Sequence, residues 1–456
     1  MRVTIAGCGV RAPPRRGGTP VTPAVMDTSA PLPQAGAVKQ PTDLPDVFDP
    51  RIHAAGPPHD AFRELRDRAP VAWQEEPAVL GWPAGPGFWA VTRHADVVRV
   101  LKEAGTYSSW LGATQIRDPA PADLPFIRRM MLNQDPPEHG GLRRLAARAF
   151  TPGRVARFEG TARARARALL AAAVADGGEV DLVRAVTDDY ALLNLTDLLG
   201  VPPGDRGLLH TWTERVIAYQ DPDEPAVLDA EGKPLNPRSP AMLAEMFGYA
   251  QELAAYKRKH PADDLMTALA TTELADAELE MFFFLLTVAG NDTVRSAAPG
   301  SVLALCGNPG EQRRLWRGEV GTDTAVDELL RVHPPVLSFR RTAARATELA
   351  GVRIAEGDKV VVFHVSANHD ERVFPDPHRL DLGRRPNPHV SFGDGPHVCL
   401  GAHFARLQLR VFHEELRACC GGVEAAGPPR RLVSNFINGV KSSPVRLLPG
   451  PAAPRG

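Results

Sequence analysis

The chain has 456 residues, a formal net charge of −1 and 43% hydrophobic residues. A charge this close to zero provides no basic surface for nucleic acid, and five cysteines in so long a chain do not form the framework of a disulfide-rich secreted domain. The sparse, odd set of cysteines leads us to expect a cytoplasmic protein, and the charge leads us to expect no nucleic-acid partner. No apolar run reaches the ~18 residues of a membrane-spanning helix, so we expect no membrane anchor.

The N-terminal 45 residues are rich in proline, glycine and alanine and predict a disordered tail, with Met26 as an alternative start of the chain. The segment VTIAGCGVRA approaches a dinucleotide-binding fingerprint at Gly7, Gly9 and Ala12. Such a fingerprint must open a helix, whereas two prolines follow Ala12 directly, so we reject dinucleotide binding here. The apolar part is also too short for a signal peptide.

Globular patterns extend over residues 46–448, where we expect one large domain, followed by a short tail at 449–456. The predicted fold class is mainly α, with small β-sheets near both ends of the domain. In chain order we expect a helix at 58–70, strands at 71–75 and 87–93, mostly helices from 96 to 301 with a Pro-rich loop at 221–240, strands within 349–363 and a helix at 400–420. Pro299 should kink or end the long apolar helix that starts near Asp276.

A glycine-rich turn, FGDGPHVCLG at residues 392–401, contains Cys399. Gly393 and Gly395 permit a tight turn and the close approach of another group, and the helix that follows predicts a lowered pKa for the thiol. A solitary cysteine is often a small buried hydrophobic residue. It lacks the additional ligands of a zinc site, and as a nucleophile it would need a base such as His397. An axial thiolate on heme iron fits an isolated, shielded cysteine best.

This turn resembles the heme-thiolate signature of the cytochrome P450 family. Every defining position matches: Phe392, Gly393, Gly395, His397, Cys399 and Gly401. The resemblance covers roughly residues 46–448. It implies the P450 fold in a single heme-binding domain, heme b (iron protoporphyrin IX) as the cofactor, and Cys399 as the proximal iron ligand, with the other matched residues beside the heme.

The segment AGNDT at residues 289–293 resembles the oxygen-activating segment of the same family. The small residues Ala289 and Gly290 would leave room for dioxygen, and an acid beside a hydroxyl, Asp292 and Thr293, can relay protons. Without the resemblance, Thr293 would only hydrogen-bond within its helix and Asp292 would be a solvated charge. Family members commonly have glutamate where this chain has Asp292.

The segment ELLR supplies Glu328 and Arg331, three residues apart. On a helix surface such a pair stabilises by only ~0.3 kcal/mol. The resemblance instead implies a buried structural triad that a later arginine completes, and Arg384 matches that position best. These three residues are expected to hold the fold around the heme without taking part in the chemistry.

The two heme propionates require cationic partners. The resemblance assigns this role to His139 and Arg143, to His397, and to an arginine of SFRRTA. The family pattern selects Arg341, with the adjacent Arg340 left open. Taken singly, each of these residues would be a solvated surface cation, and their convergence on one anionic ligand is what the resemblance predicts.

The resemblance is to bacterial members without an N-terminal anchor, which take electrons from a ferredoxin and an NAD(P)H-dependent ferredoxin reductase. The sequence shows no flavin or iron–sulfur segment, so these redox partners are expected to be separate proteins. His403, Arg406 and Arg410 follow Cys399 closely. We interpret them as a basic patch that docks an acidic ferredoxin.

The nearer resemblance is to actinobacterial enzymes that oxidise terminal methyl groups of sterols and methyl-branched lipids. It is carried by MLNQDPPEH, AGNDTVRSA, FRRTA, RRPNPHVSFG and NFINGVKSSPVRL. It implies a monooxygenase that hydroxylates a lipophilic small molecule, such as a sterol, a terpenoid or a methyl-branched lipid. Tailoring of a polyketide or another natural product, a peroxygenase and a non-catalytic heme protein are alternatives. The expected substrate pocket is lined by Phe283, Leu286, Thr287, residues 109–126 and 336–339, Phe436 and Ile437.

Overall fold

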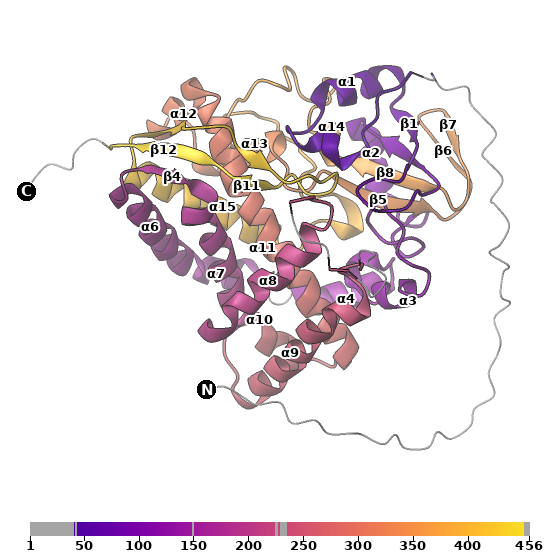
Figure 1. Ribbon diagram of the computed structural model, residues 1–456, viewed down its shortest axis with the longest axis horizontal. Helices are drawn as coiled ribbons and strands as arrows, with labels where there is room; N and C mark the ends of the chain where they lie inside the picture. The colour runs from indigo at the N-terminus through magenta and orange to yellow at the C-terminus, as the bar shows by residue number, and fades with distance from the viewer. Residues whose placement is uncertain (1–40, 42, 148–149, 224–226, 229–234, 451–456) are drawn as a thin grey trace, which may run out of the picture. The chain divides into compact units, whose positions relative to one another are not determined.

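The computed structural model describes residues 41, 43–147, 150–223, 227–228 and 235–450. The chain divides into two compact units, Met1–Ala37 and Val38–Gly456. The first unit lies entirely outside the described residues, as do Met26, the fingerprint-like glycines and residues 451–456. The second unit is mainly helical with small sheets (Figure 1), which confirms the predicted fold class.

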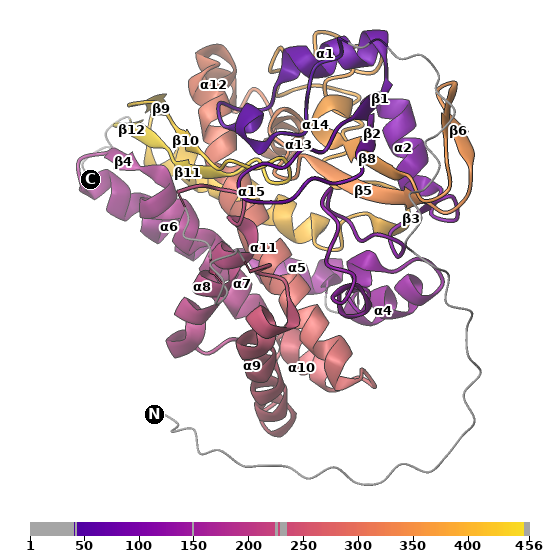
Figure 2. The same cartoon turned by 45° about the vertical axis from the view of Figure 1, so that its right-hand side comes forward.

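A 31-residue helix, α11 (Asp276–Cys306), runs through the middle of the helical region (Figures 1 and 2). It packs against α7 (Asp188–Leu199), α8 (Arg206–Ile217), α9 (Pro240–Lys259) and α15 (Ala402–Cys419). A helix that is apolar on most of its faces is stable only when buried, and these neighbours bury it. Of the two expected effects of Pro299, a kink or the end of α11, the ending is wrong, because the helix continues to Cys306. Packing on several sides compensates for the hydrogen bond that proline cannot make.

The largest sheet has five strands in the order β1-β2-β8-β5-β3, with β2 and β8 parallel and the other pairs antiparallel. Their bounds are β1 (Val71–Gln74), β2 (Phe88–Val91), β3 (Tyr107–Ser108), β5 (Ser338–Ala343) and β8 (Lys359–Phe363). Alternate side chains of β8 enter two different cores. One core is covered by α1 (His59–Arg68) and the other by α2 (His94–Lys102). Both faces of the sheet are therefore buried, which explains the continuous apolar run in β8.

Three smaller sheets pair β4-β12-β9, β10-β11 and β6-β7. The remaining elements are η1 (Pro50–His53), α3 (Leu124–Ile127), η2 (Met131–Asn133), α4 (Glu138–Ala147), α5 (Pro152–Arg157), α6 (Glu159–Ala175), β4 (Glu179–Asp181), η4 (Val183–Thr187), η5 (Pro203–Asp205), α10 (Leu265–Ala270), α12 (Pro309–Trp316), α13 (Thr322–Val332), β6 (Thr347–Leu349), β7 (Val352–Ile354), α14 (His364–Ala367), η6 (Gly395–His397), β9 (Gly422–Ala425), β10 (Arg430–Arg431), β11 (Val440–Ser442) and β12 (Pro444–Leu448). The predicted strands and the two predicted helices at 58–70 and 400–420 are present.

The predicted triad of Glu328, Arg331 and Arg384 is formed in the buried interior. The Glu328 carboxylate accepts hydrogen bonds from Arg331 Nε at 2.7 Å and Arg384 Nε at 3.1 Å. Both arginines also donate to backbone carbonyls of the segment that precedes the cysteine turn, including those of Asn368 and Pro377. The triad therefore fixes the path of the chain from α14 toward Cys399.

Candidate active site

The Cys399 turn joins η6 to α15 and is held by its own backbone. The Cys399 N–H donates to the Phe392 carbonyl at 2.8 Å. Gly393 and Gly395 adopt φ values of +70° and +67°. A Cβ atom on Gly395 would lie 2.5 Å from the Leu101 carbonyl oxygen, so this glycine is required both by its conformation and by the approach of α2.

The predicted effect of the helix terminus on the Cys399 thiol is outweighed by burial. The dominant cause is desolvation, which raises the pKa of the thiol, while a Gly401 backbone hydrogen bond, Arg143 and Arg406 lower it to a smaller extent. The expectation of a lowered pKa is therefore wrong for the free thiol. The Cys399 side chain is exposed to a cavity that it lines, and a desolvated thiol of this kind becomes a thiolate when it coordinates a metal ion.

Cys399 faces a cavity of about 230 Å³ that lies between the cysteine turn and α11. The lining includes these predicted site residues: Ala289, Gly290, Thr293, His139, Arg143, Arg341, Phe392, Gly393, His397, Cys399 and Gly401. The structure thus brings together residues from α4, α11, β5 and the turn. Asp292 does not line this cavity.

Gly290 has a packing role as well as a place in the cavity wall. A Cβ atom on Gly290 would lie 2.6 Å from Leu195 Cδ1 of α7. The missing side chain therefore allows α7 and α11 to approach each other. Ala289, in contrast, exposes its surface toward the cavity, which is the arrangement expected for a residue that leaves space for a small ligand.

Four cationic or ionisable side chains gather at one edge of the cavity without a carboxylate in ion-pair contact, within the residues that the structure describes. Arg341 is buried and its pKa is lowered to about 10, chiefly by desolvation. Burial, with the nearby arginines, lowers the pKa of His139 to about 4 and of His397 to about 2. The pKa of Arg143 is likewise lowered by burial. Such a cluster is stabilised when an anionic group binds, and this is the property needed to hold heme propionates.

The choice between Arg340 and Arg341 follows from their alternation along β5. Arg341 lines the Cys399 cavity. Arg340 points to the other side, where its Nη1 lies 2.5 Å from Asp118 Oδ1, and it is absent from the cavity wall. Neighbouring residues of a strand face opposite sides of the sheet, so only Arg341 can reach a group bound in the cavity.

The acid and the hydroxyl of α11 lie on different parts of the helix surface. Thr293 lines the cavity, and its Oγ1 donates to the Ala289 carbonyl at 2.7 Å. Asp292 is only 2% exposed, and burial raises the pKa of its carboxyl to about 7. Arg295 Nη1 lies 3.8 Å from Asp292 Oδ1, while Arg295 Nε donates to Asp188 at 2.5 Å. Asp292 is therefore near its midpoint of protonation at neutral pH.

A second cavity of about 520 Å³ adjoins the first and shares Ala289, Thr293, Val336 and Phe339 with it. As predicted, it is lined by parts of residues 109–126 and 336–339 and by Phe436 and Ile437. The residues of α11 that line it are Met281, Phe284, Leu285, Val288, Ala289, Asp292 and Thr293.

None of the three predicted pocket residues of α11 lines the larger cavity. Phe283 and Thr287 are fully buried elsewhere, and Leu286 lines the Cys399 cavity instead of the larger one. Each residue of a helix is rotated by about 100° from the one before, so an error of one position moves a side chain off the cavity. Counting back four and eight residues from Ala289 would have found Leu285 and Met281.

Two arginines that the sequence analysis did not select also line the larger cavity. Arg117 donates to the Pro83 carbonyl at 2.7 Å and leaves its Nε and Nη2 atoms buried without a hydrogen-bond partner. The Arg238 guanidinium lies 5.1 Å from the centre of the Tyr219 ring. No acidic residue forms an ion pair with either arginine in the described part of the chain.

The proposed basic docking patch is not a set of free cations. Arg406 Nε donates to Asp327 at 2.8 Å. Arg410 forms ion pairs with Glu159 at 2.7 Å and with Glu414 at 3.1 Å. Among the described residues, His403 is the one member of the proposed patch that is exposed and forms no ion pair. The two arginines therefore tie α15 to its neighbours, and their charge is largely balanced.

Comparison with known proteins agrees with the geometry. The family model for cytochrome P450 matches residues 321–416. The steroid C26-monooxygenase of Mycobacterium tuberculosis is 37% identical over 406 residues, which cover 87% of this chain and 91% of that protein. The methyl-branched lipid omega-hydroxylase of the same organism is 37% identical over 394 residues, covering 84% and 90%. The solved structure of a Mycobacterium marinum cytochrome P450 in complex with pseudoionone is 38% identical, has a TM-score of 0.76 and covers 85% of this chain and 94% of that one.

No helix in the described part of the chain combines the length and the apolar character needed to cross a membrane. The identity to the Mycobacterium tuberculosis steroid C26-monooxygenase extends over most of both sequences, and the fold is that of solved P450 structures. The chain belongs to the cytochrome P450 family and is a P450 monooxygenase.

Proposed function

We propose that this chain binds heme b with Cys399 as the axial ligand and hydroxylates a lipid at the end remote from its polar head. The observation that carries the proposal is a single cavity with the Cys399 thiol exposed in its wall and the cations Arg143 and Arg341, which form no ion pair among the described residues, at its edge. A heme fits this donor set because the thiol can ligate iron and the cations can receive the propionates. When bound, the heme supplies oxygen activation, and a thiolate ligand favours cleavage of the O–O bond.

The residues of α11 would control protons on the opposite side of the cavity. Thr293 faces the cavity, and its hydroxyl is held by the Ala289 carbonyl. Asp292, buried behind it with a pKa of about 7, can both accept and donate a proton at neutral pH. We assign Asp292 as the proton source and Thr293 as the group that orients the transfer.

The shape and polarity of the larger cavity support a lipid with a polar end. Most of its lining is apolar, as expected for a lipophilic ligand. Arg117 and Arg238 line the larger cavity but not the Cys399 cavity. They would bind the carboxylate or carbonyl of a substrate whose apolar end extends toward Ala289 and Thr293. The names of the two mycobacterial relatives describe oxidation of a steroid at C26 and omega-hydroxylation of a methyl-branched lipid.

Optical titration of the purified ferric protein tests this substrate class. A substrate that binds beside the heme would change the spin state of its iron, which is read from the position of the Soret band. The proposal expects the shift with sterol 3-ketones or methyl-branched fatty acids, and expects Arg117→Gln to weaken binding of the fatty acids about tenfold or more. Silence with these lipids, combined with a shift from macrolactones, would instead support natural-product tailoring, the activity of some P450s of similar structure.

Electrons would come from a ferredoxin and an NAD(P)H-dependent ferredoxin reductase, with the protein acting in the cytoplasm. Because Arg406 and Arg410 are ion-paired, reversal of their charge would disturb α15 as well as docking. His403 is exposed on the same helix, so His403→Glu is the cleaner substitution. Slower reduction by ferredoxin, with an unchanged ferrous–CO spectrum, would support docking at this face. A higher turnover with hydrogen peroxide than with ferredoxin would favour a peroxygenase.

A further inference from the structure

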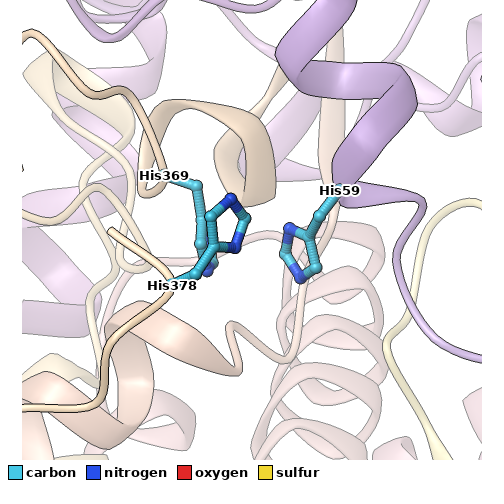
Figure 3. Close-up of side chains that lie close together, drawn as sticks. All are labelled: His59, His369 and His378. Carbon is cyan, nitrogen blue, oxygen red and sulfur yellow. The ribbon is translucent and has the colours of Figure 1, made fainter. Parts of the chain in front are cut away.

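Three histidines from distant parts of the sequence meet in a cluster separate from both cavities (Figure 3). His59 is the first residue of α1, His369 follows α14, and His378 lies in the loop after it. One ring nitrogen of each residue lies within 4.8 Å of one from each of the others. The His59 and His369 rings are closest, with centroids 4.2 Å apart.

The hydrogen bonds of the cluster leave ring nitrogens available for a ligand. His369 Nδ1 lies 2.9 Å from the Val365 carbonyl oxygen, so this nitrogen carries the proton and Nε2 keeps its lone pair. A metal-ligating histidine is usually oriented by a hydrogen bond of this type from its other ring nitrogen. His59 Nδ1 is buried and has no hydrogen-bond partner. His378 is exposed and provides a route for an ion to enter.

The backbone around two of the histidines is held rigidly. Arg331 Nη1 donates to the carbonyl of Asn368 at 2.8 Å and to that of Pro377 at 2.9 Å. These are the residues directly before His369 and His378. One guanidinium nitrogen of the structural triad therefore sets the spacing of the two ligands, which is the kind of support that a preformed metal site needs.

The charges around the cluster do not prevent a cation from binding. Arg66 is fully buried, but its Nη2 forms an ion pair with Glu371 at 2.8 Å, and Arg331 is paired with Glu328 at 2.7 Å. Arg63 also lies near His378 but pairs with Asp60 at 3.2 Å, while Glu371 adds negative charge there.

We propose that His59, His369 and His378 form a binding site for a divalent transition-metal ion of the zinc type, completed by water. Three imidazole nitrogens and an open position are a common zinc arrangement, with Zn–N distances of about 2.0–2.1 Å. Around one tetrahedral ion the nitrogens are about 3.3 Å apart. Binding of the ion would therefore draw the three ring nitrogens, which lie within 4.8 Å of one another, closer together. The ion would link α1 to the loop that the triad holds, and thereby stabilise the fold by binding only its native form.

The test uses the full-length heme-loaded protein without a histidine tag, dialysed against EDTA and then titrated with ZnCl2. Bound zinc is counted by elemental analysis, and affinity is measured by calorimetry. We expect one zinc ion per chain and a higher unfolding temperature with zinc. His378→Ala should weaken binding by at least about 100-fold, since the loss of an outer-sphere partner alone costs 10–100-fold. His260→Ala, which removes another exposed histidine at the end of α9, should leave zinc affinity unchanged.

The ferrous–CO spectrum of each variant provides the control for folding, because it reports on a different site. X-ray absorption at the zinc edge should show a shell of imidazole nitrogens in wild type that shrinks in His378→Ala. Equal zinc affinity in wild type and His378→Ala, or no zinc retained by a wild-type protein with an intact spectrum, would overturn the proposal.

Discussion

Replacement of Asp292 by asparagine should stabilise the fold at high pH and slow catalysis at the same time. Burial raises the pKa of this carboxyl from 3.8 to about 7. Because the folded-state pKa is raised, the wild type is most stable while the carboxyl is protonated in both states, below pH 3.8. Stability then falls as the pH rises toward 7, since the unfolded chain ionises first.

The magnitude follows from the shift in pKa. A difference of about three units, at about 1.36 kcal/mol per unit, corresponds to about 4 kcal/mol lost by the wild type between pH 4 and pH 8. Asp292→Asn cannot ionise and should lack this loss. Denaturant unfolding at both pH values measures the difference. Glu280→Gln, another carboxylate of α11 that hydrogen-bonds Gln251, serves as the control and should keep the wild-type pH dependence.

The catalytic part of this prediction is a fall in turnover of about 10²-fold or more, as expected when a general acid is removed. The rate of product formation per heme, measured against pH, would show it. An Asp292→Asn variant with the same pH dependence of stability as wild type would refute the burial argument. Unchanged turnover would refute the role of Asp292 as the proton source.

Three further outcomes are expected. Glu328→Gln should lower the free energy of unfolding by about 3–5 kcal/mol, because it leaves two buried guanidinium groups without their carboxylate; an unchanged melting temperature would contradict this. Arg341→Gln should speed heme loss at least about tenfold, whereas Arg340→Gln should not. The rate of heme transfer to apomyoglobin measures this loss, and equal rates for the two variants would be inconsistent with the cavity geometry. Burial lowers the pKa of His413 from 6.5 to about 4, so the unfolded chain takes up a proton first as the pH falls. Wild type should therefore lose about 2 kcal/mol more free energy of unfolding than His413→Gln between pH 7 and pH 5. Urea unfolding of both proteins at the two pH values measures this difference, and an equal loss in both would contradict the prediction.

The sequence was most informative where chemistry demands fixed spacing. The glycines around Cys399 are required by positive φ values and by the close approach of α2, so the turn could be recognised without a structure. Glu328 and Arg331 could also be recognised from the sequence, because their spacing places them on one face of α13. In each case the constraint is local, and a local constraint leaves a pattern in the sequence.

The predictions that the structure contradicts concern properties that depend on packing. Helix α11 is apolar on most faces, so its pattern does not show which face lines the cavity, and it predicts Phe283 where Phe284 lines the cavity. Strand alternation shows that Arg340 and Arg341 point opposite ways, but only the packed sheet shows which one reaches the cavity. The raised pKa of the Cys399 thiol depends on the protein that surrounds it. The histidine cluster joins the start of the domain to its later part, and no spacing rule connects such residues.

The measurement that tests the central claim most directly is the ferrous–CO spectrum of the heme-loaded wild type compared with Cys399→Ser. If Cys399 is the axial ligand, wild type should show the red-shifted Soret band typical of a thiolate-ligated heme, and Cys399→Ser should lose that band even where heme remains bound. A variant that keeps the red-shifted band would show that another group ligates the iron and would contradict the account.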